Sequence, residues 1–323
     1  MDLIYTNAQR VDLGVLQAYV LDLSFGTDSG ENDFELTLGK SEPYLEDGAI
    51  IYIEGTEYGG IVGGMKSSSA DETRTSIGRT WHGILNSKVI EPDPGADYLT
   101  ISGDANECLA FIVDRLGLSA LFAAEEIPSG ITIKNYKFSR YVKGYDGLRA
   151  MLANAGAKLK MRWTSARVIL YVEKIVDYTD APIDSDEAVL KVERYGNKVN
   201  HLICLGSGEL AARQVIHLYV DQYGRIGNTQ HFVGLEEVTD VYEYSNAENS
   251  DELRTGGIDR LTELRSIDKV EVLADEGVEL EYDIGDIIGG IDTYSGNTAK
   301  ATITQKIVRI DNGAVSIDYK TSR

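Results

Sequence analysis

Apolar and polar residues alternate one by one through the first third of the chain. Every odd position from 19 to 25 is apolar or aromatic, which is the period-two pattern of a half-buried strand. Segments 34–38 and 51–54 repeat the pattern, and turn-forming residues separate the three segments. Strands of this length and spacing predict a small barrel or sandwich, which residues 74–90 would complete.

The pattern becomes helical after residue 100. Asp104 is a predicted N-cap, and Glu107 follows three residues later, where a capping box places its acidic residue. Gly117 stands where a helix commonly ends in a left-handed glycine. Between these signals, one helix face is apolar and consists of Leu109, Ile112, Val113 and Leu116.

A second helix is predicted over residues 145–155, with Gly156 at its end. Segments 159–163 and 168–175 then predict a hairpin with its turn at 164–166. Together these elements indicate a small α/β domain that ends near Pro182.

The last third returns to strands, with one helix predicted over residues 250–267. Asn249 or Ser250 would cap this helix, and its pair of glycines, Gly256 and Gly257, weakens it by roughly 1–2 kcal/mol relative to alanines. Packing by Leu253, Leu261 and Leu264 must therefore hold it. The predicted strands are 199–205, 214–220, 236–244, 269–273, 302–310 and 314–319.

These elements predict a mainly β protein with an α+β insert. A length of 323 residues suggests two or three domains. The expected domains are a first β domain (1–100), a small α/β domain (101–190) and a second β domain with one helix (191–323).

The charge distribution follows the same division. The net charge is -21, which argues against nucleic-acid binding as the main role. Residues 1–100 and 191–323 carry most of the excess of acidic residues, whereas residues 101–190 are almost neutral. Two acidic ends therefore flank a nearly neutral middle.

The middle region contains a basic cluster with interleaved tyrosines. Single-strand nucleic-acid binders have such a composition, but a solvated face or a patch that docks on an acidic neighbour has it too. Because the rest of the chain is strongly acidic, docking is the favoured interpretation. The cluster consists of Lys134, Lys137, Arg140, Lys143, Arg149, Lys158, Lys160, Arg162, Arg167 and Lys174.

Enzyme-like motifs are weak. Residues 206–211 read GSGELA, a GxGxxA string, but no alternation of strands and helices surrounds it, so a glycine-rich hairpin turn is expected instead of a cofactor site. The histidines are scattered and match no metal-binding spacing. They are His82, His201, His217 and His231.

Neighbouring carboxylates are also expected by chance in a chain with 52 acidic residues. The pairs 125–126, 236–237 and 275–276 are therefore weak candidates for glycosidase chemistry.

Cys108 and Cys204 match no metal or disulfide spacing, which favours a reducing compartment. No signal peptide or membrane span is predicted, and no catalytic, cofactor-binding or metal-binding residue is expected.

Three strings resemble the tail-hub family of bacteriophages and contractile injection systems, in particular the tail-tip hubs of siphophages. Residues 79–85, RTWHGIL, resemble the segment where the first barrel ends before a helix. Residues 200–209, NHLICLGSGE, are similar to the strand and glycine turn with which hubs enter the second barrel. Residues 283–288, DIGDII, with the later hairpin, are similar to the closing part of the family.

The resemblance implies a homotrimer in which two tail-tube-like β-barrels per subunit form a pseudo-hexameric ring around a DNA channel. It also implies a place in the virion tail, with a distal tail or tail-tube protein, tape-measure protein or tail-fibre protein as partners. Some family members carry a fused lytic domain, and this chain, ending at Arg323, is expected to lack one. A carbohydrate-binding module and a cell-wall lytic enzyme are the alternatives.

A DNA channel suggests a role for the acidic residues. Because like charge repels phosphates, acidic side chains from segments 22–35 and 271–286 are expected to line the channel. The alternative is that this charge only keeps the surface soluble.

Overall fold

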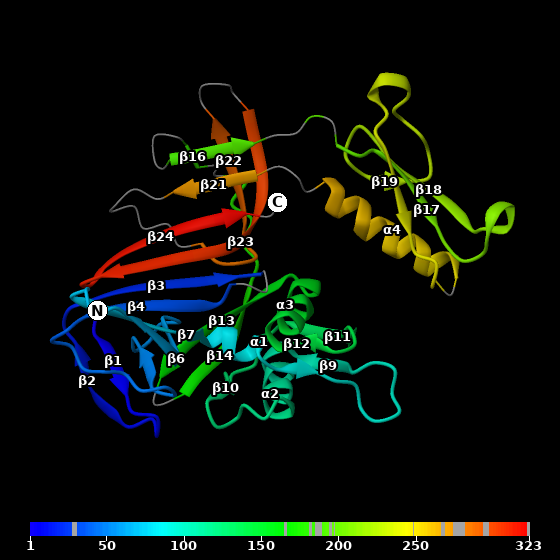
Figure 1. The fold of residues 1–323 in the computed structure, drawn as a ribbon. Coiled ribbons are helices and arrows are strands. Elements are labelled where there is room, and N and C mark those ends of the chain that lie inside the picture. The colour runs from blue at the N-terminus through cyan, green and yellow to red at the C-terminus, as the bar shows by residue number, and fades with distance from the viewer. Residues whose placement is uncertain are drawn as a thin grey trace.

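The computed structural model of the chain describes residues 1–27, 31–164, 167–180, 183–184, 189–193, 196, 198–247, 249–265, 269–273, 282–292 and 297–321. Its largest feature is one 13-stranded sheet that contains strands from both ends of the chain. Figure 1 shows the N-terminal and C-terminal strands side by side, with two smaller parts attached. The protein is mainly β, as the hydrophobic pattern predicts.

The N-terminal half of the large sheet runs in the order β3-β4-β7-β6-β5-β1-β2. Its strands are β1 (Leu3–Thr6), β2 (Asp12–Leu16), β3 (Tyr19–Gly26), β4 (Asp33–Gly39), β5 (Ile50–Tyr52), β6 (Gly59–Ser67) and β7 (Thr73–Thr80).

The C-terminal half continues this sheet through an antiparallel pairing of β3 with β23, from Val20 opposite Asp311 to Gly26 opposite Gln305. The order beyond β23 is β24, β21 and β16, while β22 also pairs with β23 and β15 pairs with β22. These strands are β15 (Ile183–Asp184), β16 (Val189–Glu193), β21 (Lys269–Leu273), β22 (Ile287–Asp292), β23 (Asn297–Asp311) and β24 (Ala314–Thr321).

The N-terminal half of the sheet curls around its own core. Inward residues of β1 and β2, such as Leu3 and Leu16, share one hydrophobic cluster with Leu21 of β3 and with Val308 and Ile310 of β23. Among the described strands, β2 and β16 stand at the two ends of the sheet without pairing with each other. The curl therefore resembles a barrel wall, but no closed barrel forms within the described residues.

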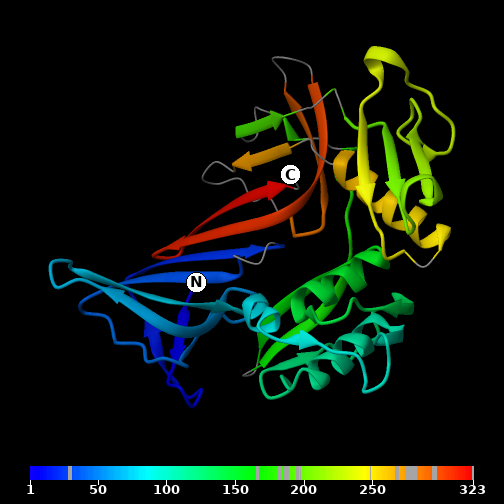
Figure 2. The same ribbon diagram turned by 45° about the vertical axis from the view of Figure 1, so that its right-hand side comes forward.

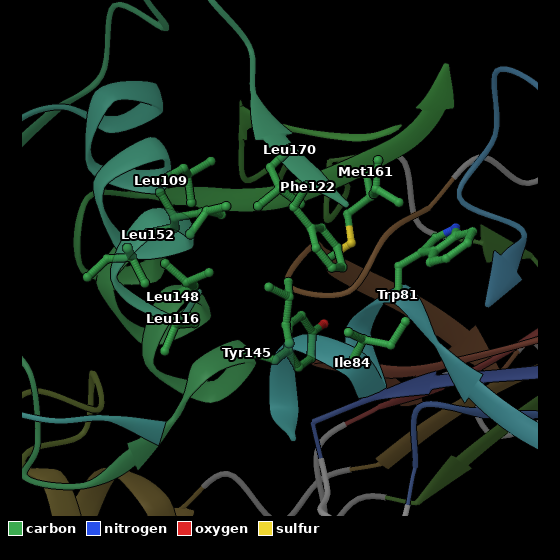
Figure 3. Packing of buried hydrophobic residues seen from close by; sticks show 14 of the residues in the cluster. Trp81, Ile84, Leu109, Leu116, Phe122, Tyr145, Leu148, Leu152, Met161 and Leu170 are labelled. Atoms are coloured by element: carbon green, nitrogen blue, oxygen red, sulfur yellow. The ribbon is translucent and has the colours of Figure 1, made fainter. Parts of the chain in front are cut away.

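A small α/β part follows β7 along the chain. Figure 3 shows its core, where Trp81 and Ile84 lie towards Tyr145, Phe122 and Met161. Its elements are α1 (Trp81–Asn86), β8 (Val89–Ile90), β9 (Thr100–Asp104), α2 (Ala105–Arg115), β10 (Phe122–Ala124), β11 (Thr132–Lys137), β12 (Val142–Lys143), α3 (Gly144–Asn154), β13 (Ala157–Thr164) and β14 (Arg167–Lys174).

The predicted helices and hairpin of this part are confirmed. The Asp104 side chain caps α2 by accepting a hydrogen bond from the Asn106 backbone N–H (2.9 Å), and not from Glu107 as a capping box would require. Gly117 and Gly156 follow the two helices with positive φ values of 69°. Strands β13 and β14 pair antiparallel, as the predicted hairpin requires.

The expectation that residues 74–90 complete the first β domain is wrong for its second half. Strand β7 ends at Thr80, whose side chain caps α1 by accepting from the Gly83 N–H (3.4 Å). The apolar residues of α1, Ile84 and Leu85, then pack into the core of the α/β part.

Residues 199–264 form a further unit between β16 and β21, with a sheet and a hydrophobic core of its own. It lies to the right in Figures 1 and 2. The sheet order is β19-β18-β17-β20, with β17 (His201–Leu205), β18 (Val215–Val220), β19 (Ile226–Gly227) and β20 (Thr239–Glu243).

Helix α4 (Ser250–Arg265) packs on this sheet, and its two glycines are explained by close contact. A Cβ at Gly257 would lie 2.5 Å from the Cys204 Sγ atom, and a Cβ at Gly256 would lie 2.9 Å from the Tyr242 hydroxyl oxygen. The Asn249 side chain accepts hydrogen bonds from the N–H groups of Asp251 and Glu252, so Asn249 caps the helix.

Candidate functional site

A buried cluster of charged side chains joins three distant segments of the chain. The Lys306 Nζ atom of β23 lies 2.7 Å from a carboxylate oxygen of Glu57 and 3.5 Å from one of Asp283. The Lys158 Nζ atom of β13 lies 2.7 Å from Asp286 and 3.2 Å from Asp283, and Lys160 also pairs with Asp283. The cluster therefore ties the α/β part to both halves of the large sheet.

Asp286 is the best-satisfied member of the cluster. Its side chain is fully buried, and besides Lys158 it accepts hydrogen bonds from the N–H groups of Val176 (2.9 Å) and Asp283 (3.0 Å). A buried carboxylate with several donors is held in one orientation. Asp286 therefore fixes the turn at residues 283–286 against β13.

The charges of the cluster stabilise one another. Burial alone would raise the pKa of Asp283, but the ammonium groups of Lys306 and Lys160 outweigh burial and hold it well below its usual value. Burial would likewise raise the pKa of Glu57, yet Lys306 brings about a net lowering. Conversely, burial would lower the pKa of Lys306, but Glu57 raises it well above its ordinary value. All three groups are charged at neutral pH.

His82 of α1 lies beside this cluster and is neutral. Burial lowers its pKa to about 4, although Glu57 opposes that shift from 3.7 Å away. The ring packs edge-on against Phe25 and Tyr145, with centroid distances of 4.9 and 5.0 Å. Its Nδ1 atom is buried without a hydrogen-bond partner, so no donor or acceptor there favours a charged ring.

Acidification is expected to destabilise the protein through His82. Because the pKa of His82 is about 4 in the folded protein and near 6.5 in an unfolded chain, the unfolded chain binds the proton first as the pH falls. The free energy of unfolding should therefore drop between pH 6.5 and pH 4, by about 3 kcal/mol in total. Urea unfolding at several pH values measures this loss.

His82→Gln should remove most of the pH dependence in this range, whereas His231→Gln, at an exposed histidine, should leave it unchanged. Equal slopes for the wild-type protein and His82→Gln would contradict the assignment.

The GxGxxA string lies in a hairpin. Strands β17 and β18 pair antiparallel on either side of it, and Gly208 has a φ of 96°. The segment after Gly208 forms a short 3-10 helix (Leu210–Ala212) in place of the long helix that a dinucleotide site needs. The predicted glycine-rich turn is confirmed.

Two of the histidines lie side by side on the sheet of the 199–264 unit. The Nδ1 atom of His201 lies 2.6 Å from Glu237, and its Nε2 atom lies 2.8 Å from the Nδ1 atom of His217. The two nitrogens are within hydrogen-bond distance of each other, so they pair directly. Among the residues that the structure describes, no three His, Cys, Asp or Glu side chains group as metal ligands would.

In each of the two described carboxylate pairs, one member forms an ion pair with another side chain of the protein. Glu125 pairs with Arg162, and Glu237 binds His201. The pair at 275–276 lies outside the described residues.

Cys108 and Cys204 are buried free thiols, and burial raises the pKa of each. No helix within the described ranges is long and apolar enough to cross a bilayer.

The structure divides the basic cluster of residues 134–174 into two groups. Lys158, Lys160 and Arg162 pair with carboxylates of this chain. The sequence could not indicate this, because the partners lie up to 128 residues away. The others form no ion pair within the described residues: Lys134, Lys137, Arg140 and Lys143 are exposed on β11, on β12 and between them, Arg167 and Lys174 are exposed on β14, and Arg149 of α3 lies over the Tyr145 ring.

The acidic residues expected to line a channel fall into two groups, one on the surface of the sheet and one enclosed in the ionic cluster. Asp22 pairs with Arg309 (2.8 Å) and Glu35 with Lys66 (2.6 Å), on the face of β3 and β4 that points away from the core. Asp283 and Asp286 are enclosed in the ionic cluster and cannot face a channel, so the expectation is wrong for these two residues.

Comparison with solved structures identifies the fold. The chain is similar over its whole length to a tail protein from Neisseria meningitidis MC58 (TM-score 0.58, 12% identity, 96% of that chain covered). It is equally similar to prophage tail proteins from Shewanella oneidensis (0.59, 11%, 98%) and Listeria monocytogenes EGD-e (0.56, 12%, 94%). No protein-family model and no curated protein sequence matches the chain.

The fold is therefore that of phage tail proteins, and the resemblance predicted from the three strings is confirmed at the level of the fold.

Proposed function

We propose that this chain is a hub subunit of a phage tail tip and that three copies form a ring joining the tail tube to the tip. The observation that carries this proposal is the single sheet through which β3 and β23 join the two halves of the chain, in a fold shared end to end with phage tail proteins. In this proposal, β1 to β7 and the strands β15, β16 and β21 to β24 supply the two tube-like β units expected from residues 1–100 and 191–323. Residues 81–174 form the α/β domain expected over residues 101–190, and residues 199–264 are an additional unit.

The curl of the sheet supports this arrangement. The N-terminal half wraps around one core, and the C-terminal half has a second small core built on Ile288, Ile303 and Tyr319. Two such units in each of three subunits would give a ring of six similar parts. Because the sheet edges at β2 and β16 are unpaired within the described chain, barrel closure would need residues of neighbouring subunits or of the undescribed segments.

The channel wall in this proposal is the outer face of β3 and β4. Asp22, Ser24, Asp33, Glu35 and Thr37 alternate with the core residues there, so the face is polar. Arg309 and Lys66 offset part of its negative charge. A wall with a modest negative excess would let DNA pass without binding it, and solubility is the alternative role of this charge.

The partners in this proposal are further copies of the chain, a distal tail or tail-tube protein, and a tape-measure or tail-fibre protein, all in the virion tail. The chain would act as a structural protein and not as an enzyme. A carbohydrate-binding module and a tail-associated lytic enzyme are the competing functions, for which glycan arrays and peptidoglycan turnover are the respective assays.

Light scattering after size-exclusion chromatography tests the ring. The expected mass is three times that of the 35.4 kDa chain, and electron micrographs of tails carrying the labelled chain should place three copies at the tip. A single copy per tail would contradict the proposal. Peptidoglycan hydrolysis that is lost on replacing one carboxylate would favour the enzyme.

A further inference from the structure

One face of the sheet in the 199–264 unit is uncovered. Leu202, Cys204 and Leu218 point into the core beneath α4. The alternation of the strands places Ile203, Leu205, Val215 and Val241 on the opposite face, where Val215 is 46% exposed and Val241 is 50% exposed. The other half of this face is polar and aromatic, since the same alternation places the stacked rings of His201, His217 and Tyr219 there. Figures 1 and 2 place α4 on the side of this sheet nearer the rest of the chain, so the open face points away from it.

Exposed apolar residues also occur in the loops at both ends of this sheet. Leu210, in the loop between β17 and β18, is 95% exposed, and Val233 and Leu235, in the loop before β20, are also exposed. Single exposed apolar residues are common, but a contiguous group marks an interaction surface. We call this surface, with Ile203, Leu205, Val215, Val241 and Leu210, the open face. Its border is acidic, with exposed Glu209 and Glu236. Glu243 lies on the face itself, opposite Leu205 and 3.6 Å from Arg213.

The α/β part has a positively charged surface, opposite in sign to the acidic border of the open face. Lys134, Lys137, Arg140 and Lys143 are exposed, and no ion pair to any of them is found in the described part of the chain. Lys137 lies over the ring of Tyr98 (5.9 Å) and Arg140 over that of Tyr141 (5.6 Å), and both rings are at least half exposed. We call these four cations and two tyrosines the basic patch. Arg and Tyr are enriched where proteins bind one another.

We propose that the basic patch of one copy docks on the open face of the next copy. The two surfaces complement each other in charge, and each combines apolar or aromatic area with charged groups. Because α4 lies between the open face and the rest of its own chain, the patch of the same chain cannot reach that face. The contact joins two different surfaces, so it is head-to-tail, and repeated contacts of this kind generate a closed ring when the rotation fits.

This inference rests on the proposed ring and names the surfaces that would hold it together. Charge reversal on the full-length chain tests it by sedimentation velocity over a range of concentrations. Lys137→Glu with Arg140→Glu, or Glu209→Lys with Glu236→Lys, should each weaken self-association by at least about tenfold. The variant with all four substitutions should recover most of the association, since both surfaces then have inverted charge.

Arg167→Glu with Lys174→Glu is the matched control for the first of these variants, because it makes the same change in net charge at exposed cations of β14 outside both surfaces and should leave association unchanged. Self-association that neither reversal alters would overturn this contact and leave the ring proposal standing. A chain that is monomeric at every concentration and present as one copy per tail would overturn both. Binding of duplex DNA that the Lys137→Glu, Arg140→Glu variant loses, with association unaffected, would assign the patch to nucleic acid.

Discussion

Replacing Lys306 with methionine is expected to lower the free energy of unfolding by about 3–5 kcal/mol, because it leaves the Glu57 carboxylate, which is largely buried, without its cation. The Lys306 side chain is 9% exposed, and it lies between Glu57 and Asp283. Methionine keeps the length of the side chain, so the loss of packing is small and the loss of charge dominates. Chemical unfolding at pH 7 measures the change.

Two further variants distinguish the cost of losing a buried cation from the cost of losing an exposed one. Lys66→Met removes an exposed partner of Glu35, where both side chains are more than half exposed, and should cost only about 0–1 kcal/mol. Adding Glu57→Gln to Lys306→Met should cost less than the sum of the single changes, because the unpaired carboxylate is then absent. A loss below 1 kcal/mol for Lys306→Met would show that the cluster does not hold the segments together.

Local elements of this chain were predictable because their signals are local. The start of α2 follows from one side chain, Asp104, that accepts a hydrogen bond from a nearby backbone N–H. Its end follows from Gly117, which adopts a positive φ. The strand β3 was visible because alternate residues enter one core.

The joining of the two chain ends was not predictable from such signals. Arg309 and Asp22 face each other across β23 and β3, but they are 287 residues apart and nothing in either strand specifies its partner. The strand pattern of residues 199–244 also gave no sign that these strands form a separate sheet, because periodicity identifies a strand and not the sheet it joins.

The ionic cluster was missed for a similar reason. Lys158 and Lys160 were grouped with their neighbours in sequence as one basic surface, whereas their partners come from residues 283–286. The string DIGDII was noticed only as a family-like turn. Asp286 accepts from three donors, and Asp283 pairs with Lys158 and Lys160, so both aspartates of the turn belong to the ionic cluster.

A second large loss of stability is expected from a substitution where the large sheet packs against the α/β part. Trp81→Ala should lower the free energy of unfolding by about 3–5 kcal/mol, the usual cost of truncating a fully buried tryptophan. Its ring is completely buried and stacks on Trp163 of β13 at 5.2 Å, and Trp163 in turn stacks on Tyr52 of β5 at 4.5 Å. The backbone of Trp163 also accepts a hydrogen bond from the Gly55 N–H (2.9 Å) and donates one to the Thr56 carbonyl (2.8 Å), in the turn between β5 and β6.

Because this stack belongs to both parts, Trp81→Ala should lower the unfolding midpoint of the sheet and of the α/β part together. Hydrogen exchange can follow the two separately, through amides of β4 and of α3. Phe111→Ala is the control, since Phe111 lies on α2 with half of its surface exposed, and its loss should cost no more than about 1 kcal/mol. Faster exchange in α3 alone would mean that the aromatic stack serves only the α/β core and does not couple the two parts.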